Sequence, residues 1–208
     1  MKNILCFGDS NTWGYTPITG ERYAHHVRWT GVLRNSLGKG YWIVEEGLNG
    51  RTTVHNEKER PFRSGLDLFP VILESHAPID LVVLMLGTND LKSRFNRTEF
   101  EISMDIKSLC KKILGSSSEA NDEIKILLVP PPPLNTMPDE DGLEFTDAIQ
   151  KSLGLANLYQ SVSEDLGIHF LDAGKIVKTN TLDGVHWDES QHQDFGEAIS
   201  RKISSILG

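Results

Sequence analysis

Three features are scarce in this sequence: cysteine, positive charge and long apolar runs. Their scarcity argues against a disulfide-bonded or zinc-binding protein, a nucleic-acid-binding protein and a membrane-spanning protein. Its two cysteines, Cys6 and Cys110, lack the spacing of a zinc site and are better explained as buried thiols than as a disulfide. The 21 Lys and Arg residues against 29 Asp and Glu give a formal net charge of −8, which argues against a nucleic-acid or membrane-surface partner. The apolar stretch at 4–7 is too short for a signal-peptide core or a membrane span, so we expect a cytoplasmic protein.

What the sequence does contain is an alternation of short apolar runs with longer amphipathic stretches. The apolar runs predict strands at 4–7, 41–44, 81–86, 124–129 and 168–171. Apolar residues at helical spacing predict helices at 28–37, 98–114, 145–166 (interrupted near Gly154) and 189–207. This order predicts an α/β fold: a single-domain, three-layer α/β/α sandwich over 1–208, with a central, mainly parallel five-stranded sheet of the flavodoxin-like type.

Small and polar residues follow the predicted strands. The segments are GDSN at 8–11, GLNGRTT at 47–53 and GTND at 87–90, and DGVH at 183–186 precedes the last helix. Because ligands bind beyond the carboxyl ends of strands in open parallel sheets, we expect these segments to meet in one site.

Ser10 and His186 are the candidates for nucleophilic chemistry. A serine hydroxyl is a weak nucleophile and needs a base to accept its proton. Among seven histidines, only His186 lies in a tight glycine-containing turn with a carboxylate, Asp183, three residues earlier. That spacing allows Asp183 to orient the imidazole and to stabilise its charged form. Asp172, directly after the last predicted strand, is the competing acid.

An oxyanion formed during attack on an ester needs hydrogen-bond donors. The backbone N–H of Ser10, the backbone N–H of Gly50 and the side-chain amide of Asn89 are the candidate donors. A glycine at position 50 allows its N–H to approach a ligand closely.

Several neighbours of these residues have two interpretations each. Trp13, Tyr15 and Val185 either line a pocket for the acyl or alcohol part of a substrate or simply belong to the core. Arg51 either binds a charged group or makes a structural ion pair, and the second is favoured. Asp9 is expected to brace the site by hydrogen bonding and not to take part in catalysis.

The four segments, in this order from 7 to 186, resemble the SGNH branch of the GDSL esterase and lipase family, and they look especially like its arylesterase/acyltransferase subgroup. The resemblance implies that Ser10, Gly50, Asn89 and His186 are the four residues that give the branch its name, with Asp183 as the acid. The departure is Asn11, where the family name implies leucine, and this leaves the polarity of the pocket open.

The resemblance also implies an activity. We expect hydrolysis of esters with short acyl groups, namely aryl, alkyl or sugar acetates, through an acyl-serine that water or an alcohol accepts. The mechanism requires no metal and no cofactor, and members of the subgroup tend to form homo-oligomers.

Two alternatives remain open at the level of sequence. One is a metal-dependent phosphoesterase, whose ligands would be drawn from Asp9, Asn89, Asp90, Asp183 and His186. The other is a non-enzymatic flavodoxin-like module in which Ser10, Asn11 and Thr12 hold a phosphate.

Overall fold

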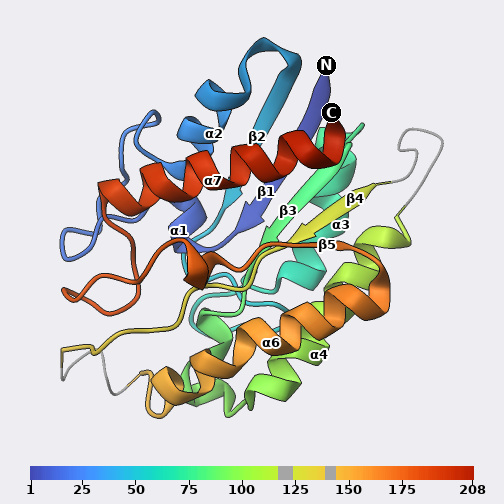
Figure 1. Cartoon of the computed structure of the whole chain (residues 1–208). Coiled ribbons are helices and arrows are strands. Elements are labelled where there is room, and N and C mark those ends of the chain that lie inside the picture. The colour runs from blue at the N-terminus through green and yellow to red at the C-terminus, as the bar shows by residue number, and fades with distance from the viewer. Residues whose placement is uncertain (117–123, 139–143) are drawn as a thin grey trace.

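The computed structural model describes residues 1–116, 124–138 and 144–208, and its centre is one five-stranded sheet (Figure 1). The strands are β1 Lys2–Gly8, β2 Tyr41–Gly47, β3 Leu81–Met85, β4 Lys125–Leu128 and β5 His169–Phe170. The helices are α1 Ser10–Trp13, α2 Trp29–Leu37, α3 Gly65–His76, α4 Glu99–Leu114, α6 Ala148–Leu166 and α7 Glu189–Leu207. Short 3₁₀ turns lie at Gly38–Gly40, Asn89–Leu91, Ser93–Phe95 and Ala173–Lys175.

The sheet has the strand order β2-β1-β3-β4-β5, and every neighbouring pair is parallel. This is the flavodoxin-like order, in which the chain reverses direction of travel across the sheet at β1 and β3. The predicted fold class is therefore confirmed. Each predicted strand is present, with ends that differ by a few residues.

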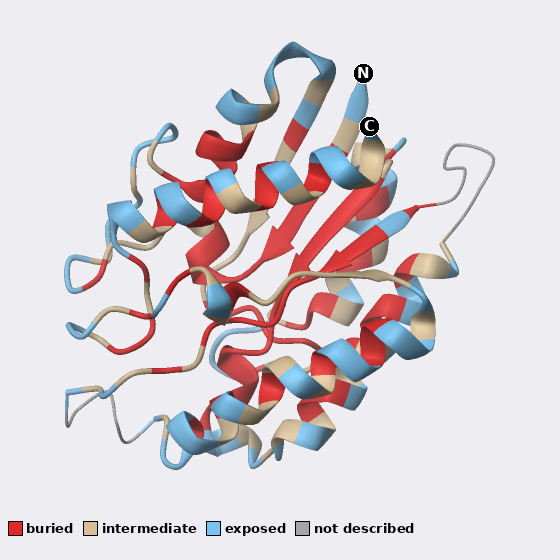
Figure 2. Cartoon of the chain, in the orientation of Figure 1, coloured by how far each residue is buried: buried red, intermediate tan, exposed pale blue. Residues whose placement is uncertain are grey.

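The two faces of the sheet bury separate apolar clusters because successive strand residues point to opposite sides. Ile4 and Cys6 of β1 face a cluster that includes residues of α2 and α7. Leu5 and Phe7 face a cluster formed with α3, α4 and α6. Buried residues accordingly occupy the strands and the inner sides of the flanking helices, as Figure 2 shows.

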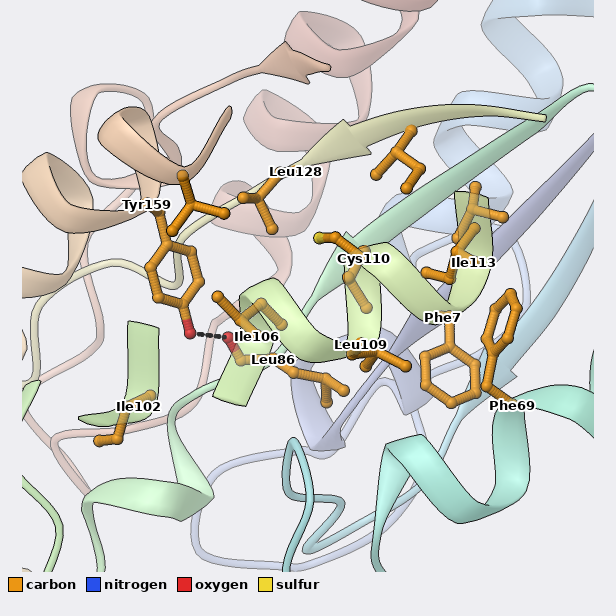
Figure 3. Close-up of a cluster of buried hydrophobic side chains, with 14 of the residues drawn as sticks. Phe7, Phe69, Leu86, Ile102, Ile106, Leu109, Cys110, Ile113, Leu128 and Tyr159 are labelled. Carbon is orange, nitrogen blue, oxygen red and sulfur yellow. Dashed lines mark hydrogen bonds between the residues drawn. The ribbon is translucent and has the colours of Figure 1, made fainter. Parts of the chain in front are cut away.

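The hydroxyl of Tyr159 on α6 is a polar group inside the second of these clusters. The hydroxyl donates a hydrogen bond of 3.0 Å to the carbonyl oxygen of Leu86, directly after β3 (Figure 3). Around it pack apolar side chains such as Ile102, Ile106 and Leu128. The bond satisfies a buried donor and joins α6 to the end of the central strand.

Two features of the helices differ from the sequence-based prediction. The helix α3, with Pro70 inside it, was not predicted. The predicted interruption near Gly154 was wrong, because α6 runs without a break from Ala148 to Leu166. A Cβ at Gly154 would lie 3.1 Å from Cγ of Glu99, so this glycine allows α4 and α6 to pack closely and does not end the helix.

The carboxyl ends of the strands all point toward one set of loops, which includes the segment around α1 (Figure 1). GDSN, GLNGRTT and GTND follow β1, β2 and β3 at this edge. None of the helices in the described ranges combines the length and the apolar character needed to cross a bilayer.

Candidate active site

Ser10 stands at the sharp junction between the first strand and the first helix. β1 ends at Gly8, where a Cβ would come within 2.1 Å of the Thr12 hydroxyl, so only glycine fits. Asp9 caps α1 by accepting a hydrogen bond of 3.1 Å from the backbone N–H of Asn11. Ser10 is thereby fixed at the beginning of α1, and it is 6% exposed. The bracing expected of Asp9 is present.

Asp183 and His186 lie in one turn before α7. Oδ1 of Asp183 accepts from the backbone N–H groups of Val185 and His186, each at 2.9 Å. Gly184, which follows Asp183 in this turn, has a φ of 74°, and a Cβ there would lie within 2.6–2.8 Å of atoms of residues 135–137. The glycine therefore allows the turn to pack closely against residues 135–137.

The imidazole of His186 bridges this carboxylate and the serine hydroxyl. Its Nδ1 lies 2.7 Å from Oδ2 of Asp183, and its Nε2 lies 3.0 Å from Oγ of Ser10. Burial acts to raise the pKa of Asp183, but hydrogen bonds from the ring and backbone of His186 hold that pKa below its usual range. An ionised carboxylate only accepts hydrogen bonds, so Nδ1 carries the proton and Nε2 is left to accept the serine proton.

Asn11 joins the two segments that carry these groups. Its Nδ2 donates to the carbonyl of Val185 at 3.3 Å, and its Oδ1 accepts from the N–H of Trp187 at 3.1 Å. Its side chain is buried and does not line the cavity described below. The question of pocket polarity raised by this position is thus answered: Asn11 connects the serine turn to both sides of His186.

The three predicted oxyanion donors lie on the same cavity wall. Ser10, Gly50 and Asn89 all line the cavity, and Gly50 has a φ of 79°, a backbone conformation that favours glycine. The Asn89 amide donates 3.1 Å to the carbonyl oxygen of Arg51. Because an amide nitrogen carries two hydrogens, one remains for a ligand.

A buried polar network holds the loop that carries Gly50. The Asp90 carboxylate accepts from the backbone N–H of Thr53 at 3.0 Å and 3.1 Å, and from its hydroxyl at 2.6 Å. Arg51 donates to the Gly8 carbonyl at 2.9 Å and stacks 4.0 Å over the Phe7 ring. Burial lowers the pKa of Arg51 to about 10. The structural ion pair favoured for Arg51 is present, with Glu46 at 3.9 Å.

The cavity has a volume of about 550 Å³. Tyr15 and Val185 line it, and the Tyr15 ring stacks on His186 with centroids 4.2 Å apart. The prediction that Trp13 lines the pocket is not met. The Trp13 ring instead contacts Tyr15, with centroids 6.5 Å apart, and lies under the guanidinium of Arg22 at 5.0 Å.

Sequence reasoning missed a further group of cavity residues. These are Ile18, Asn49, Arg60, Lys92, Pro138, Glu144, Phe145 and Leu182. Three of them had a usable signal: Asn49 precedes Gly50, Leu182 precedes Asp183, and Lys92 follows Asn89 by three residues. The others come from long loops, where no local sequence pattern indicates which side chains face the cavity.

The competing acid and the metal alternative gain no support from the geometry. Asp172 accepts from the N–H of Gly174 at 2.9 Å and lies 3.8 Å from Nζ of Lys175, so its contacts are within its own turn. The carboxylates of Asp9 and Asp90 already accept hydrogen bonds, from Asn11 and from Thr53 respectively. Within the described part of the chain, no group of three or more His, Cys, Asp or Glu residues is arranged to hold a metal ion.

Comparison with known proteins gives one family. Residues 6–193 match the sequence profile of the GDSL-like lipase/acylhydrolase family. The chain is also similar to a curated acetylxylan esterase from Xylanibacter ruminicola, with 23% identity over 219 residues. That match covers 96% of this chain but only 42% of the longer relative.

Solved structures of similar proteins match the whole chain. An aryl esterase from M. smegmatis is 39% identical with a TM-score of 0.96, and the match covers 100% of both chains. A carbohydrate acetylesterase from Sinorhizobium meliloti is 37% identical, with the same TM-score and coverage. The similarity thus extends over every segment that contributes to the cavity.

Proposed function

The chain belongs to the GDSL-like lipase/acylhydrolase family, and from this premise we propose that it hydrolyses carboxylic esters with short acyl groups, such as aryl, alkyl or sugar acetates. The observation that carries the proposal is the chain of contacts from Asp183 through His186 to Ser10, at 2.7 Å and 3.0 Å. The aryl esterase and carbohydrate acetylesterase neighbours support this substrate range. Neither the family match nor the engaged carboxylates favour a metal-dependent phosphoesterase.

In the proposed mechanism, Ser10 is the nucleophile and His186 the base. Nε2 of His186 takes the hydroxyl proton as Oγ attacks the ester carbonyl, and Asp183 stabilises the resulting imidazolium. The N–H groups of Ser10 and Gly50 and the amide of Asn89 hold the tetrahedral oxyanion. His186 then gives its proton to the leaving alcohol, and an acyl-serine remains. Water, deprotonated by the same ring, releases the acid and restores the serine.

Transfer of the acyl group to an alcohol is the finer part of this proposal. Tyr15, Val185, Phe145 and Leu182 give some apolar walls to a cavity that also has polar lining residues. Such walls disfavour water relative to an organic acceptor. Product analysis in aqueous methanol tests this part: methyl ester formed in excess of the methanol mole fraction supports transfer, and its absence leaves hydrolysis alone.

Covalent labelling tests the proposal directly. A fluorophosphonate should modify Ser10, as located by peptide mass spectrometry, and Ser10→Ala should abolish both labelling and turnover of p-nitrophenyl acetate. Ser161→Ala, which changes an exposed serine on α6, is the matched control and should behave as the unmodified protein. Retention of more than about 1% of the activity in a folded Ser10→Ala protein would contradict the assignment, because loss of a triad member costs far more than this.

A cytoplasmic location and a homo-oligomeric assembly complete the proposal. The first is supported by the free, buried thiols of Cys6 and Cys110. The second is supported by apolar side chains that line the cavity yet remain exposed, Ile18 at 72% and Leu182 at 56%. Cell fractionation and light scattering check the two parts separately. The cavity of about 550 Å³ supports a small-molecule ester as the partner, and the net charge of −8 argues against a nucleic acid or an anionic membrane.

A further inference from the structure

Lys92 is a buried cation inside the proposed catalytic cavity. It follows Asn89 by three residues, its backbone N–H bonds to the Asn89 carbonyl at 3.3 Å, and it lines the same cavity as Ser10. Its side chain is 8% exposed. The proposed chemistry gives this ammonium group no task.

The charge of Lys92 is only partly balanced by its neighbours. Its ion-pair partner among the described residues is Glu144, at 3.4 Å. The Glu144 carboxylate is 43% exposed and is shared with Arg94, which it contacts more closely. A carboxylate shared in this way leaves Lys92 with capacity for another anion.

A second cation lies beside the oxyanion donors. The Arg60 guanidinium lies 3.1–3.4 Å from the place where a Cβ on Gly50 would stand, and it donates to the Asn49 carbonyl at 3.0 Å. Arg60 also lines the cavity. Of the two carboxylates on the cavity wall, Asp183 is committed to His186. Two cations thus line the cavity beside two carboxylates, one of which is paired with His186 and the other shared with Arg94.

We infer that Lys92, assisted by Arg60, forms an anion subsite, so that the chain prefers esters that carry a carboxylate near the scissile bond over neutral esters of the same size. The inference rests on the proposed ester hydrolysis at Ser10. A buried ammonium that is already desolvated forms strong charge-assisted hydrogen bonds with a carboxylate, whereas a neutral ester leaves it only the shared Glu144 carboxylate and the Phe145 ring face, 5.6 Å away.

The surroundings of Lys92 also give the preference a pH dependence. Burial, then the charges of Arg94 and Arg60, lower the pKa of Lys92 to about 8, while Glu57 and Asp9 act in the opposite direction. The adjacent Glu144 carboxylate favours the charged form as well. Because the ammonium loses its proton as the pH rises through about 8, the preference for anionic esters should decline there.

Two matched pairs of esters test whether the subsite binds a carboxylate in the acyl part or in the alcohol part of the substrate. On the acyl side, 4-nitrophenyl hemisuccinate is compared with 4-nitrophenyl butyrate. On the alcohol side, 4-acetoxybenzoate is compared with phenyl acetate. The readout is the ratio of kcat/KM for the charged ester to that for the neutral one, which a general loss of activity does not change.

Lys92→Met should lower that ratio about ten-fold for at least one pair, the size expected for a lost charge-assisted hydrogen bond. Arg60→Gln, at an exposed and therefore tolerant position, should lower it about two- to three-fold because solvent screens its charge. Lys111→Met removes one positive charge at an exposed position of α4 and should leave the ratio as it is. Equal ratios in the unmodified protein and in Lys92→Met, for both pairs, overturn the inference.

A binding measurement keeps this result separate from the proposed hydrolysis. Calorimetry on Ser10→Ala should show monomethyl succinate binding more tightly than methyl butyrate, and Ser10→Ala/Lys92→Met should weaken monomethyl succinate about ten-fold. If this binding holds but the unmodified protein hydrolyses no ester, the proposed function fails and the subsite stands. If esters are hydrolysed without a charge preference, the subsite alone fails.

Discussion

The two sides of the cavity are held in place by different kinds of interaction. Behind His186 lies aromatic packing: Trp187 is fully buried, with its ring centroid 4.9 Å from that of Phe195 and 5.6 Å from that of His192. Behind the oxyanion donors lies a buried polar network centred on Asp90 and Arg51. One side is stabilised mainly by apolar burial, and the other mainly by buried hydrogen bonds.

The difference follows from the task proposed for each side. A proton-transfer ring must keep its orientation while its charge changes, and an apolar support does not compete for its hydrogen bonds. The Gly50 donor is a backbone N–H in a loop, and the buried Asp90 carboxylate fixes that loop by accepting hydrogen bonds from the N–H and hydroxyl of Thr53. Substitutions on the two sides should therefore fail in different ways.

The largest effect should come from the proton-transfer side. Asp183→Asn replaces the carboxylate that accepts from Nδ1 of His186, so the ring can adopt the tautomer in which Nε2 is protonated and cannot act as a base. We expect kcat to fall about 10⁴-fold. The measurement is steady-state turnover of p-nitrophenyl acetate at pH 7.5.

The matched control for this variant is Asp172→Asn. Because the polar contacts of the Asp172 carboxylate with described residues lie within its own turn, its loss should change kcat less than about three-fold. Equal losses in the two variants would show that Asp183 is not the acid.

The oxyanion side should give the next effect. Asn89→Ala removes one donor to the developing charge but leaves the Ser10–His186 pair intact. kcat/KM should fall about 10²- to 10³-fold, while the shape of the pH–rate profile is retained because the base is unaltered. A shifted profile instead of a uniformly lowered one would place Asn89 in proton transfer and remove the distinction between the two sides.

The polar residues of the site were predictable from the sequence because they are local to strand ends. Ser10, Gly50 and Asn89 each follow a strand by a few residues, and parallel strands place such residues at one edge. Asp183 and His186 were found from a three-residue spacing. The network behind the donors was not predictable, because the partners Thr53 and Asp90 are 37 residues apart and bond only after folding.

Elements with strong apolar periodicity were predictable from the sequence. The two errors, the missing helix α3 and the false break in α6, each lie at a residue that is unfavourable inside a helix. Most strands and helices follow the apolar pattern, but Pro70 and Gly154 are both residues that weaken a helix on average. In α3, Ser64 caps the helix by accepting from the N–H of Asp67 at 3.2 Å, and packing of Phe69 and Leu73 supports it despite the proline. In α6, Gly154 permits the close approach of Glu99. In both helices, contacts that form only on folding outweigh the low helix propensity of the proline or the glycine.

Asn11 makes polar contacts on the side of the cavity that is otherwise supported by aromatic packing, so its substitution tests how much those polar contacts contribute. Asn11→Leu should leave the carbonyl of Val185 and the N–H of Trp187 without their partners. Each buried, unsatisfied group costs about 1–3 kcal/mol, so the free energy of unfolding should fall by about 3 kcal/mol. Urea denaturation measures it. A variant as stable as the unmodified protein would mean that these groups find other partners, and that packing alone holds the His186 turn.

The smallest effect concerns His192, which supports the same side from α7. Its Nδ1 accepts from the N–H of Trp29 at 3.3 Å, and burial lowers its pKa from 6.5 to about 4. Between these two pKa values the unfolded chain binds a proton that the folded chain does not, so this residue destabilises the fold as the pH falls. From pH 7.5 to pH 5 its contribution to the free energy of unfolding should fall by about 2 kcal/mol.

His192→Asn isolates that contribution, because an amide oxygen can replace Nδ1 as the acceptor and does not titrate. The difference in unfolding free energy between the two proteins, measured in urea at both pH values, should shift by about 2 kcal/mol in favour of the variant at pH 5. The use of a difference removes every other titrating group from the result. A difference independent of pH would show that the ring is accessible to protons in the folded state, and that the aromatic support is looser than the polar network on the opposite side.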